Sequence, residues 1–488
     1  MSTSSNPSAV YAKRRATIGR ALQAAGGGVA LLPTAPELVR NRDADFPYRH
    51  DSYFYYLTGF DEPGAWLVIS ASGKADKRGK AALGAIQSTL FCRPKDLERE
   101  IWDGIRLGPE AAPAQLGVEA AFSLDALDEK MPALLANQSA VWFPFATHKG
   151  LETQVDGWLN KVRARARQGV ECPHSQHDLC RLLDEMRLFK DAHEIALLRR
   201  AGQISAGAHV RAMQTSAAML RAGKNGPGGA QDGLREYHLE AELLHEFRRH
   251  GAQFPAYTSI VAAGGNACVL HYRAGNAELK AGQLCLIDAG CELDGYASDI
   301  TRTFPADGKF SPAQRTLYDI VQASQEAAIA ATRPGQRFND PHDAATRVLI
   351  EGMLDTGLLA KAKHGNVDDV LASGAYKQFY MHRTGHWMGM DVHDCGDYTE
   401  PGSAPQDSGE KDAQGQPLLK KPSRILQPGM VLTVEPGLYV RPAKGVPKKF
   451  WDIGIRIEDD ALVTAQGCEL LTRGVPVKSS EIEALMRG

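Results

Sequence analysis

The stretch LCLIDAGCELDGYASDITRTF, residues 284–304, predicts two paired strands in the second half of the chain. An apolar run leads into Asp288, an Asp294-Gly295 pair follows, and a second run carries Asp299. Asp-Gly between two such runs predicts a hairpin turn. If the turn centres between residues 293 and 294, Asp288 lies directly opposite Asp299. If it centres on Asp294-Gly295, the two lie one diagonal step apart. Opposed Cβ atoms are about 4.5–5.5 Å apart and diagonal ones about 7–8 Å, so either register lets two carboxylates share a site.

Two unpaired carboxylates inside a strand pair are costly, because each loses hydration and each raises the pKa of the other. A cation between Asp288 and Asp299 removes both problems. The alternative is that both aspartates cap turns at the strand ends, and this stretch alone does not decide between the two interpretations.

Three further segments carry candidate site residues. MHRTGHWMGMDVHD, residues 381–394, holds His382, His386 and His393, without the HExxH pattern of helical zinc proteases. A lone histidine is usually structural, but three in a glycine-rich apolar stretch favour a site.

GMVLTVEPGLYV (429–440) and GIRIEDD (454–460) each place an acid at the end of an apolar run. Glu435 precedes Pro436, which ends regular strand pairing. Arg456 and Glu458 are two residues apart and share one strand face, so a plain surface ion pair is the alternative for them. Together the segments supply four carboxylates and an imidazole, which suit Mn²⁺, Co²⁺, Fe²⁺ or Zn²⁺ and predict a hydrolase site with two metals.

The rest of the chain predicts an α/β (α+β) protein of two domains, with a boundary near residue 183. A helix over 15–25 stops at Gly26 and is followed by a strand over 29–32; strands at 66–70 and 88–92 flank a Lys/Gly/Ala-rich surface loop. Asp191 with Glu194 forms a capping-box pattern, and Ser311-Pro312 opens another helix. In the second half, strands are predicted over 283–289, 296–304, 430–439 and 454–459. Residues 400–422 are rich in Pro, Gly, Ser and charge and are predicted to form a surface insertion.

Composition excludes several classes. The chain has 488 residues and a net charge of −2, which argues against a general nucleic-acid binder. No apolar run is long enough for a membrane span, and the N-terminus lacks the apolar core of a secretory signal. The eight cysteines are scattered, without a CxxC pair, and are predicted to be reduced, mostly buried thiols of a cytoplasmic protein.

LIDAGCELDGYASDITRTF, HRTGHWMGMDVHD, VLTVEPGLYV and GIRIEDD resemble the signature blocks of aminopeptidase P (Xaa-Pro aminopeptidase) in the pita-bread metallopeptidase family. DFPYRHDSYFYYLTGFDEP (45–63), REIWDGIRLGPEAA (99–112) and MRLFKDAHEIALLRRAG (186–202) resemble blocks from the same family, so the resemblance covers nearly the whole chain. It implies an N-terminal aminopeptidase P domain over 1–183 and a pita-bread catalytic domain over 184–488, interrupted by the 400–422 insertion.

The resemblance also implies residue roles. Asp299 and Glu458 would bridge two metals, Asp288 would complete one of them, and His386 with Glu435 the other. Glu435 would carry the proton from a metal-activated hydroxide to the departing proline nitrogen. Substrate-facing or supporting roles would fall to His271, His382, His393, Tyr439 and Arg456.

The implied function is a metallo-exopeptidase that hydrolyses the bond between an N-terminal residue and a following proline in Xaa-Pro-Yaa peptides. Two divalent ions are expected, manganese first, with cobalt, zinc or iron fitting the same ligands. We expect peptide substrates, no nucleic acid, no membrane, and a homo-oligomer (dimer or tetramer) in the cytoplasm. The alternatives are a prolidase, which cleaves only Xaa-Pro dipeptides, and a metal-free protein of the same fold.

Overall fold

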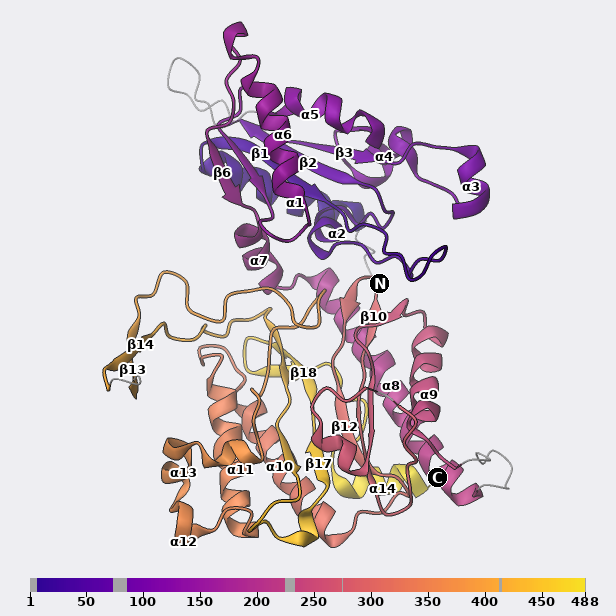
Figure 1. Cartoon of the computed structure of the whole chain (residues 1–488), viewed down its shortest axis with the longest axis vertical. Coiled ribbons are helices and arrows are strands. Elements are labelled where there is room, and N and C mark those ends of the chain that lie inside the picture. Colours follow the sequence, from indigo (N-terminus) through magenta and orange to yellow (C-terminus); the bar gives the residue numbers. More distant parts are fainter. Residues whose placement is uncertain (1–6, 73–85, 224–232, 274, 412–414, 488) are drawn as a thin grey trace. The chain divides into compact units, whose positions relative to one another are not determined.

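The computed structural model describes residues 7–72, 86–223, 233–273, 275–411 and 415–487. The chain divides into two compact units, Met1–Glu185 and Met186–Gly488 (Figure 1). Within the described ranges, no helix is long and apolar enough to cross a membrane. All eight cysteines are free, as predicted; four are buried and four partly buried.

The first unit is built on a mixed six-stranded sheet in the order β4-β3-β2-β1-β5-β6. Its strands are β1 (Gly27–Pro33), β2 (Trp66–Ser72), β3 (Gln87–Cys92), β4 (Ala120–Ser123), β5 (Ala140–Phe143) and β6 (Ser175–Asp178). Its helices are α1 (Pro7–Ala24), α2 (Ser52–Thr58), α3 (Leu97–Asp103), α4 (Gly108–Leu116), α5 (Leu127–Leu135), α6 (Leu151–Arg163) and α7 (Cys180–Leu188), the last of which runs into the second unit.

The predicted order of helix, glycines and strand at the start of the chain is confirmed. Gly26 has a φ of 98°, a value that glycine adopts without strain, and it turns the chain from α1 into β1. Val29 and Leu31 of β1 pack with α5 and α6, while the alternate residues Ala30 and Leu32 are also buried. Both faces of this sheet are therefore covered. The predicted surface loop between β2 and β3 falls at residues 73–85, outside the described residues.

The second unit places its central strands, such as β12 and β17, between two long helix pairs, α8 with α9 and α10 with α11 (Figure 1). The helices are α8 (Ala192–Ala222), α9 (Glu236–Arg249), α10 (Pro312–Ala331), α11 (Asp340–Thr356), α12 (Lys361–His364), α13 (Val367–Ser373) and α14 (Ser479–Arg487). The strands are β7 (Phe254–Pro255), β8 (Ile260–Ala263), β9 (Leu284–Asp288), β10 (Cys291–Leu293), β11 (Tyr296–Ala297), β12 (Thr301–Pro305), β13 (Gln406–Lys411), β14 (Pro417–Lys420), β15 (Val431–Val434), β16 (Gly437–Val440), β17 (Ile453–Arg456), β18 (Asp459–Val463) and β19 (Cys468–Leu470).

Both predicted helix starts are confirmed. Asp191 and Glu194 form a reciprocal capping box at the start of α8, and Ser311 caps α10 with Pro312 at its first position. Such caps satisfy backbone N–H groups that have no partner within the helix.

Three predicted strands are wrong in one respect: each is interrupted. The 296–304 strand is split between β11 and β12, the 430–439 strand between β15 and β16, and the 454–459 strand between β17 and β18. Asp299, Glu435 and Glu458 lie in these three gaps. Apolar alternation does not reveal such breaks, because the residues on either side keep the pattern of a continuous strand.

The 400–422 segment forms a hairpin of β13 and β14, and a bridge between Thr399 and Ser423 closes its base. The two strands pair through Gln406 with Lys420, Asp407 with Leu419 and Lys411 with Pro417; residues 412–414 lie outside the described residues. Leu419 is largely exposed, so the hairpin adds little to the core.

A buried ionic cluster ties the start of the second unit to the segment after His393. Asp394 accepts hydrogen bonds from Arg187 at 2.5 Å and from Lys190 at 2.9 Å, and all three side chains are almost completely buried. Burial of such a cluster is tolerable only while the charges balance.

We therefore expect Asp394→Ala to lower the free energy of unfolding by about 3–5 kcal/mol, because it removes the carboxylate that Lys190 contacts and one of the two carboxylates that Arg187 contacts, Asp391 being the other. Urea unfolding followed by circular dichroism measures the change. The matched control is Asp368→Ala, which removes an exposed partner of Arg347 and should cost at most about 1 kcal/mol. Equal effects from the two variants would contradict a stabilising role of the buried ionic cluster around Asp394.

Candidate active site

The turn between β10 and β11 sets the register of the two aspartates. Asp294 and Gly295 have φ values of 49° and 77°, as a type I′ hairpin turn requires at both central positions. The register set by this turn continues to the pair of Asp288 with Thr301. Asp299 therefore lies one diagonal step from Asp288, the second of the two predicted registers.

Glu435 and Glu458 face each other across a second pair of strands. β15 and β18 pair as far as Val434 opposite Asp459, and β16 and β17 resume pairing in the same register. The two glutamates lie opposite each other in the gap between these ladders. Glu458 also adjoins β12, because its N–H donates to the Thr301 carbonyl and its carboxylate accepts from the Thr301 hydroxyl at 2.6 Å.

His386 comes from a segment that runs beside β15. Its carbonyl accepts from the Thr433 N–H at 3.0 Å, and its N–H donates to the Thr433 hydroxyl at 3.1 Å. The imidazole Nδ1 lies 3.0 Å from the Trp387 carbonyl, and Nε2 lies 3.4 Å from Asp299. A backbone partner on Nδ1 directs Nε2 toward a metal.

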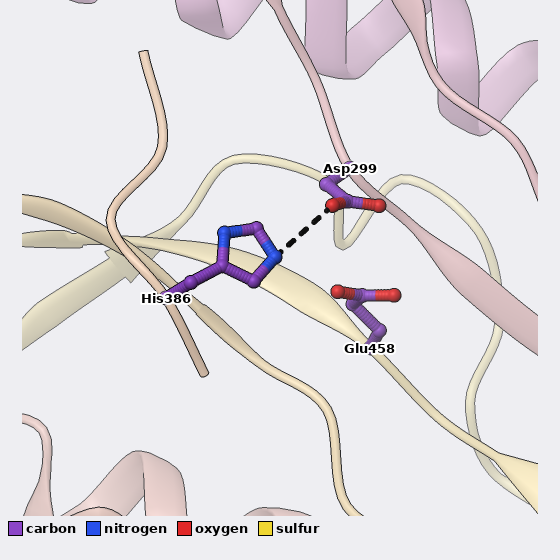
Figure 2. Close-up of side chains that lie close together, drawn as sticks. All are labelled: Asp299, His386 and Glu458. Atoms are coloured by element: carbon purple, nitrogen blue, oxygen red, sulfur yellow. Dashed lines mark ion pairs between the residues drawn. The ribbon is translucent and has the colours of Figure 1, made fainter. Parts of the chain in front are cut away.

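Three of the five predicted ligands form a tight cluster. The ligand atoms of Asp299, His386 and Glu458 lie within 4.8 Å of one another, and Figure 2 shows the three side chains pointing toward a common point. Asp288 and Glu435 line the same cavity, which has a volume of about 530 Å³. Four other predicted site residues also line this cavity: His271, His382, His393 and Arg456.

Tyr439, the remaining predicted residue, lies behind the cavity in a chain of hydrogen bonds. Its hydroxyl is 2.8 Å from His382 Nε2 and accepts from Arg456 at 3.1 Å. Arg456 in turn donates to Asp288 at 2.5 Å. This chain joins a histidine of the cavity to a predicted metal ligand and keeps both side chains in fixed orientations.

The carboxylates crowd one another. Burial, followed by the charge of Asp299, raises the pKa of Glu458 well above its usual range. Burial likewise raises the pKa of Glu435 to about 7 and that of Asp288 above its ordinary value. Burial alone would lower the pKa of His386, but Asp299 and Glu435 raise it to about 9. Burial alone would raise the pKa of Asp299, but its interaction with His386 lowers it. Without added cations, the raised pKa values favour the protonated forms of the other carboxyl groups and of His386.

The donor set fits two divalent cations. Four carboxylates and one imidazole, without a thiolate, suit Mn²⁺, Co²⁺, Fe²⁺ or Zn²⁺. Two positive ions would also remove the repulsion that raises the pKa values of Glu435 and Glu458.

Two residues that support the site were missed by the sequence analysis. The Tyr257 hydroxyl lies 2.6 Å from Asp288 and 2.7 Å from Asp299. Asp460 is buried and accepts from the Asp299 N–H at 3.1 Å. Sequence spacing does not reveal Tyr257, because this residue precedes an apolar strand and has no charged neighbour. Asp460 lies in the GIRIEDD segment, but nothing in that segment distinguishes it from an acid on the surface.

Comparison with known proteins gives two family matches. Residues 196–465 match metallopeptidase family M24, and residues 11–142 match the N-terminal domain of aminopeptidase P. The Xaa-Pro aminopeptidase of Escherichia coli is 42% identical over 98% of this chain and 97% of its own length, and that of Haemophilus influenzae is 39% identical over 98% and 97%. Human Xaa-Pro aminopeptidase 3 is 31% identical over 92% of this chain and 79% of its own length.

Comparison with solved structures finds similar proteins. The aminopeptidase PepP of Pseudomonas aeruginosa superposes with a TM-score of 0.85 at 44% identity, covering 99% of this chain and 98% of its own. An aminopeptidase P of Escherichia coli in complex with substrate superposes with a TM-score of 0.85 at 42% identity, covering 98% of each chain. The predicted fold class, with its pita-bread domain, is thereby confirmed.

Metal-free protein should bind Mn²⁺ more tightly as the pH rises from 6 to 8. Glu435, with a pKa of about 7, and His386, with a pKa of about 9, hold protons below those values and must release them to act as ligands. Calorimetric titration in buffers of different ionisation enthalpy measures the protons released. Glu435→Gln should flatten the dependence near pH 7, and an affinity that is constant from pH 6 to 8 in the unmodified protein would contradict the assignment.

Proposed function

Because the chain belongs to the aminopeptidase P branch of metallopeptidase family M24, we propose that its five predicted ligands hold two divalent metal ions at the cavity of the second unit. The observation that carries this proposal is the convergence of Asp299, His386 and Glu458, with ligand atoms within 4.8 Å of one another, beside Asp288 and Glu435. The chain is a metal-dependent exopeptidase that hydrolyses the bond between an N-terminal residue and a following proline.

Asp299 and Glu458 would hold both ions in this proposal. Asp288 would help to hold one ion, and His386 with Glu435 would help to hold the other. The position of Asp299 between Tyr257, which also contacts Asp288, and His386 supports this division. Manganese is the first expectation, with cobalt, zinc or iron as alternatives. When bound, such a pair lowers the pKa of a shared water from 15.7 to about 7 and so provides the nucleophile.

Glu435 is the proposed proton carrier. Its carboxylate lines the cavity beside the other proposed ligands, where it would accept a proton from the water and pass it to the departing proline nitrogen. His382 Nδ1 and His386 Nε2 each lie 3.8 Å from its carboxylate. General acid–base help of this kind is typically worth about 10²–10⁴-fold in rate.

His271 and His393 are proposed to donate hydrogen bonds to substrate carbonyls, since both line the cavity. Burial lowers the pKa of His393, which favours a neutral ring. A prolyl nitrogen has no N–H to donate once it is part of a peptide bond. Recognition of the second residue therefore depends on the shape of its ring and on contacts with neighbouring carbonyls.

We propose an N-terminal aminopeptidase P domain over 1–183 and a catalytic domain over 184–488. A cytoplasmic location is supported by the eight free cysteines, which are typical of a reducing compartment. A homo-oligomer is supported by the exposed apolar side chains of α3 and the loop after it, Leu97, Ile101, Trp102 and Ile105, each at least 79% exposed.

Purified enzyme should release alanine from Ala-Pro-Ala, lose this activity on chelation and regain it when Mn²⁺ is added back. The dipeptide Ala-Pro should be cleaved more slowly. An enzyme that cleaves Ala-Pro and leaves Ala-Pro-Ala intact would be a prolidase, and well-folded protein that contains no metal after purification and gains no activity from added Mn²⁺ would exclude a metallopeptidase.

Asp299→Asn and Glu458→Gln should each lower kcat/KM by several orders of magnitude, roughly 10³-fold or more, because an amide does not replace a bridging carboxylate. Circular dichroism and thermal unfolding should show an intact fold. Asp368→Asn, at an exposed ion pair outside the cavity, is the control. Turnover close to the unmodified rate in either ligand variant would contradict its bridging role.

A further inference from the structure

The two arginines that line the cavity are in different situations. Arg456 is buried, and its guanidinium is occupied by Asp288, Thr301 and Tyr439. Arg383 is exposed, and among the described residues it forms no ion pair with a carboxylate. Arg383 therefore supplies an accessible positive charge to a cavity that is also lined by four acids.

The position of Arg383 is well defined. Its carbonyl lies 2.7 Å from His382 Nδ1, which ties the backbone at this residue to a histidine of the cavity. Its guanidinium donates a hydrogen bond to the side-chain carbonyl of Asn339, another lining residue. A guanidinium held in this way can present its remaining donors as a fork, the geometry that matches a carboxylate.

The spacing matches a short peptide. In an extended tripeptide, the C-terminal carboxylate follows the first carbonyl by two residues, or about 7 Å. Arg383 and His386 are three residues apart, so their Cα atoms are separated by at most about 11 Å. The length of an extended tripeptide from its first carbonyl is thus shorter than the largest separation that the chain allows between the backbones of Arg383 and His386.

Building on the proposed function, we propose that Arg383 binds the C-terminal carboxylate of the tripeptide Xaa-Pro-Yaa, so that the enzyme prefers free tripeptides to blocked or longer peptides. The carboxyl end of the substrate is drawn to Arg383, while its first carbonyl lies at the proposed metal ligands. These two contacts set the direction in which the peptide lies in the cavity.

The test compares kcat/KM for Ala-Pro-Ala and for its C-terminal amide, which differ only in the charge at the third residue. The unmodified enzyme should favour the free acid by about tenfold, the effect expected of a hydrogen bond to a charged group. Arg383→Ala should bring the ratio close to one, and Arg383→Lys should give an intermediate ratio. Arg347→Ala, which removes an exposed arginine outside the cavity, should keep the unmodified ratio.

A ratio that is the same in the unmodified enzyme and in Arg383→Ala would overturn the proposal. Ala-Pro-Ala-Ala provides a second check, because one more residue moves the carboxylate by about 3.5 Å and should also remove the preference.

Calorimetric binding of the acid and the amide to metal-free protein separates this proposal from the proposed function. If no Xaa-Pro peptide is cleaved, the function fails while unequal binding still supports Arg383; equal binding to the unmodified protein overturns the role of Arg383 whatever the activity.

Discussion

Four carboxylates gathered in one buried place are the constraint on which the catalytic unit depends. Glu435 and Glu458 have raised pKa values because burial and neighbouring negative charges both oppose ionisation. Arg456 offsets part of this charge at Asp288, and His386 offsets part at Asp299. The remaining imbalance is the physical basis for the proposal that the cluster binds divalent cations rather than forming a set of ordinary ion pairs.

The register of the strands brings these groups together, and the interruptions of the strands allow their side chains to face the cavity. Asp299, Glu435 and Glu458 each lie where a ladder stops and then resumes. A residue inside a ladder has a side chain confined between its neighbours, whereas a residue in a gap can turn toward the cavity. Around the gaps, buried pairs keep the strands in place: Arg302 donates to Asp459 at 2.8 Å, and Asp460 accepts from the Asp299 N–H. These pairs hold the backbone of the ligands without occupying their carboxylates.

Acidic and basic side chains line the same cavity. Beside the four acids, the segment after Tyr380 contributes His382, Arg383 and His386 in close succession. Three proposed functions therefore depend on the conformation of one short segment: support of Glu435, recognition of the peptide and coordination of a metal. The hydrogen bonds between this segment and β15 fix that conformation.

The sequence by itself determined the local features: the Asp294-Gly295 turn, the caps of α8 and α10, and the diagonal placement of Asp288 and Asp299 as one of two registers. These depend on residues within a few positions of one another, where backbone preference and hydrogen-bond chemistry act directly. The resemblance to aminopeptidase P supplied the five ligands and their roles. Only the tertiary structure decided that Glu435 lies opposite Glu458, that Tyr257 contacts both aspartates, and that Arg383 reaches the cavity while Arg456 is buried. Those relations depend on pairing between segments far apart along the chain, and pairing of that kind is selected by the packing of the whole core rather than by any local pattern.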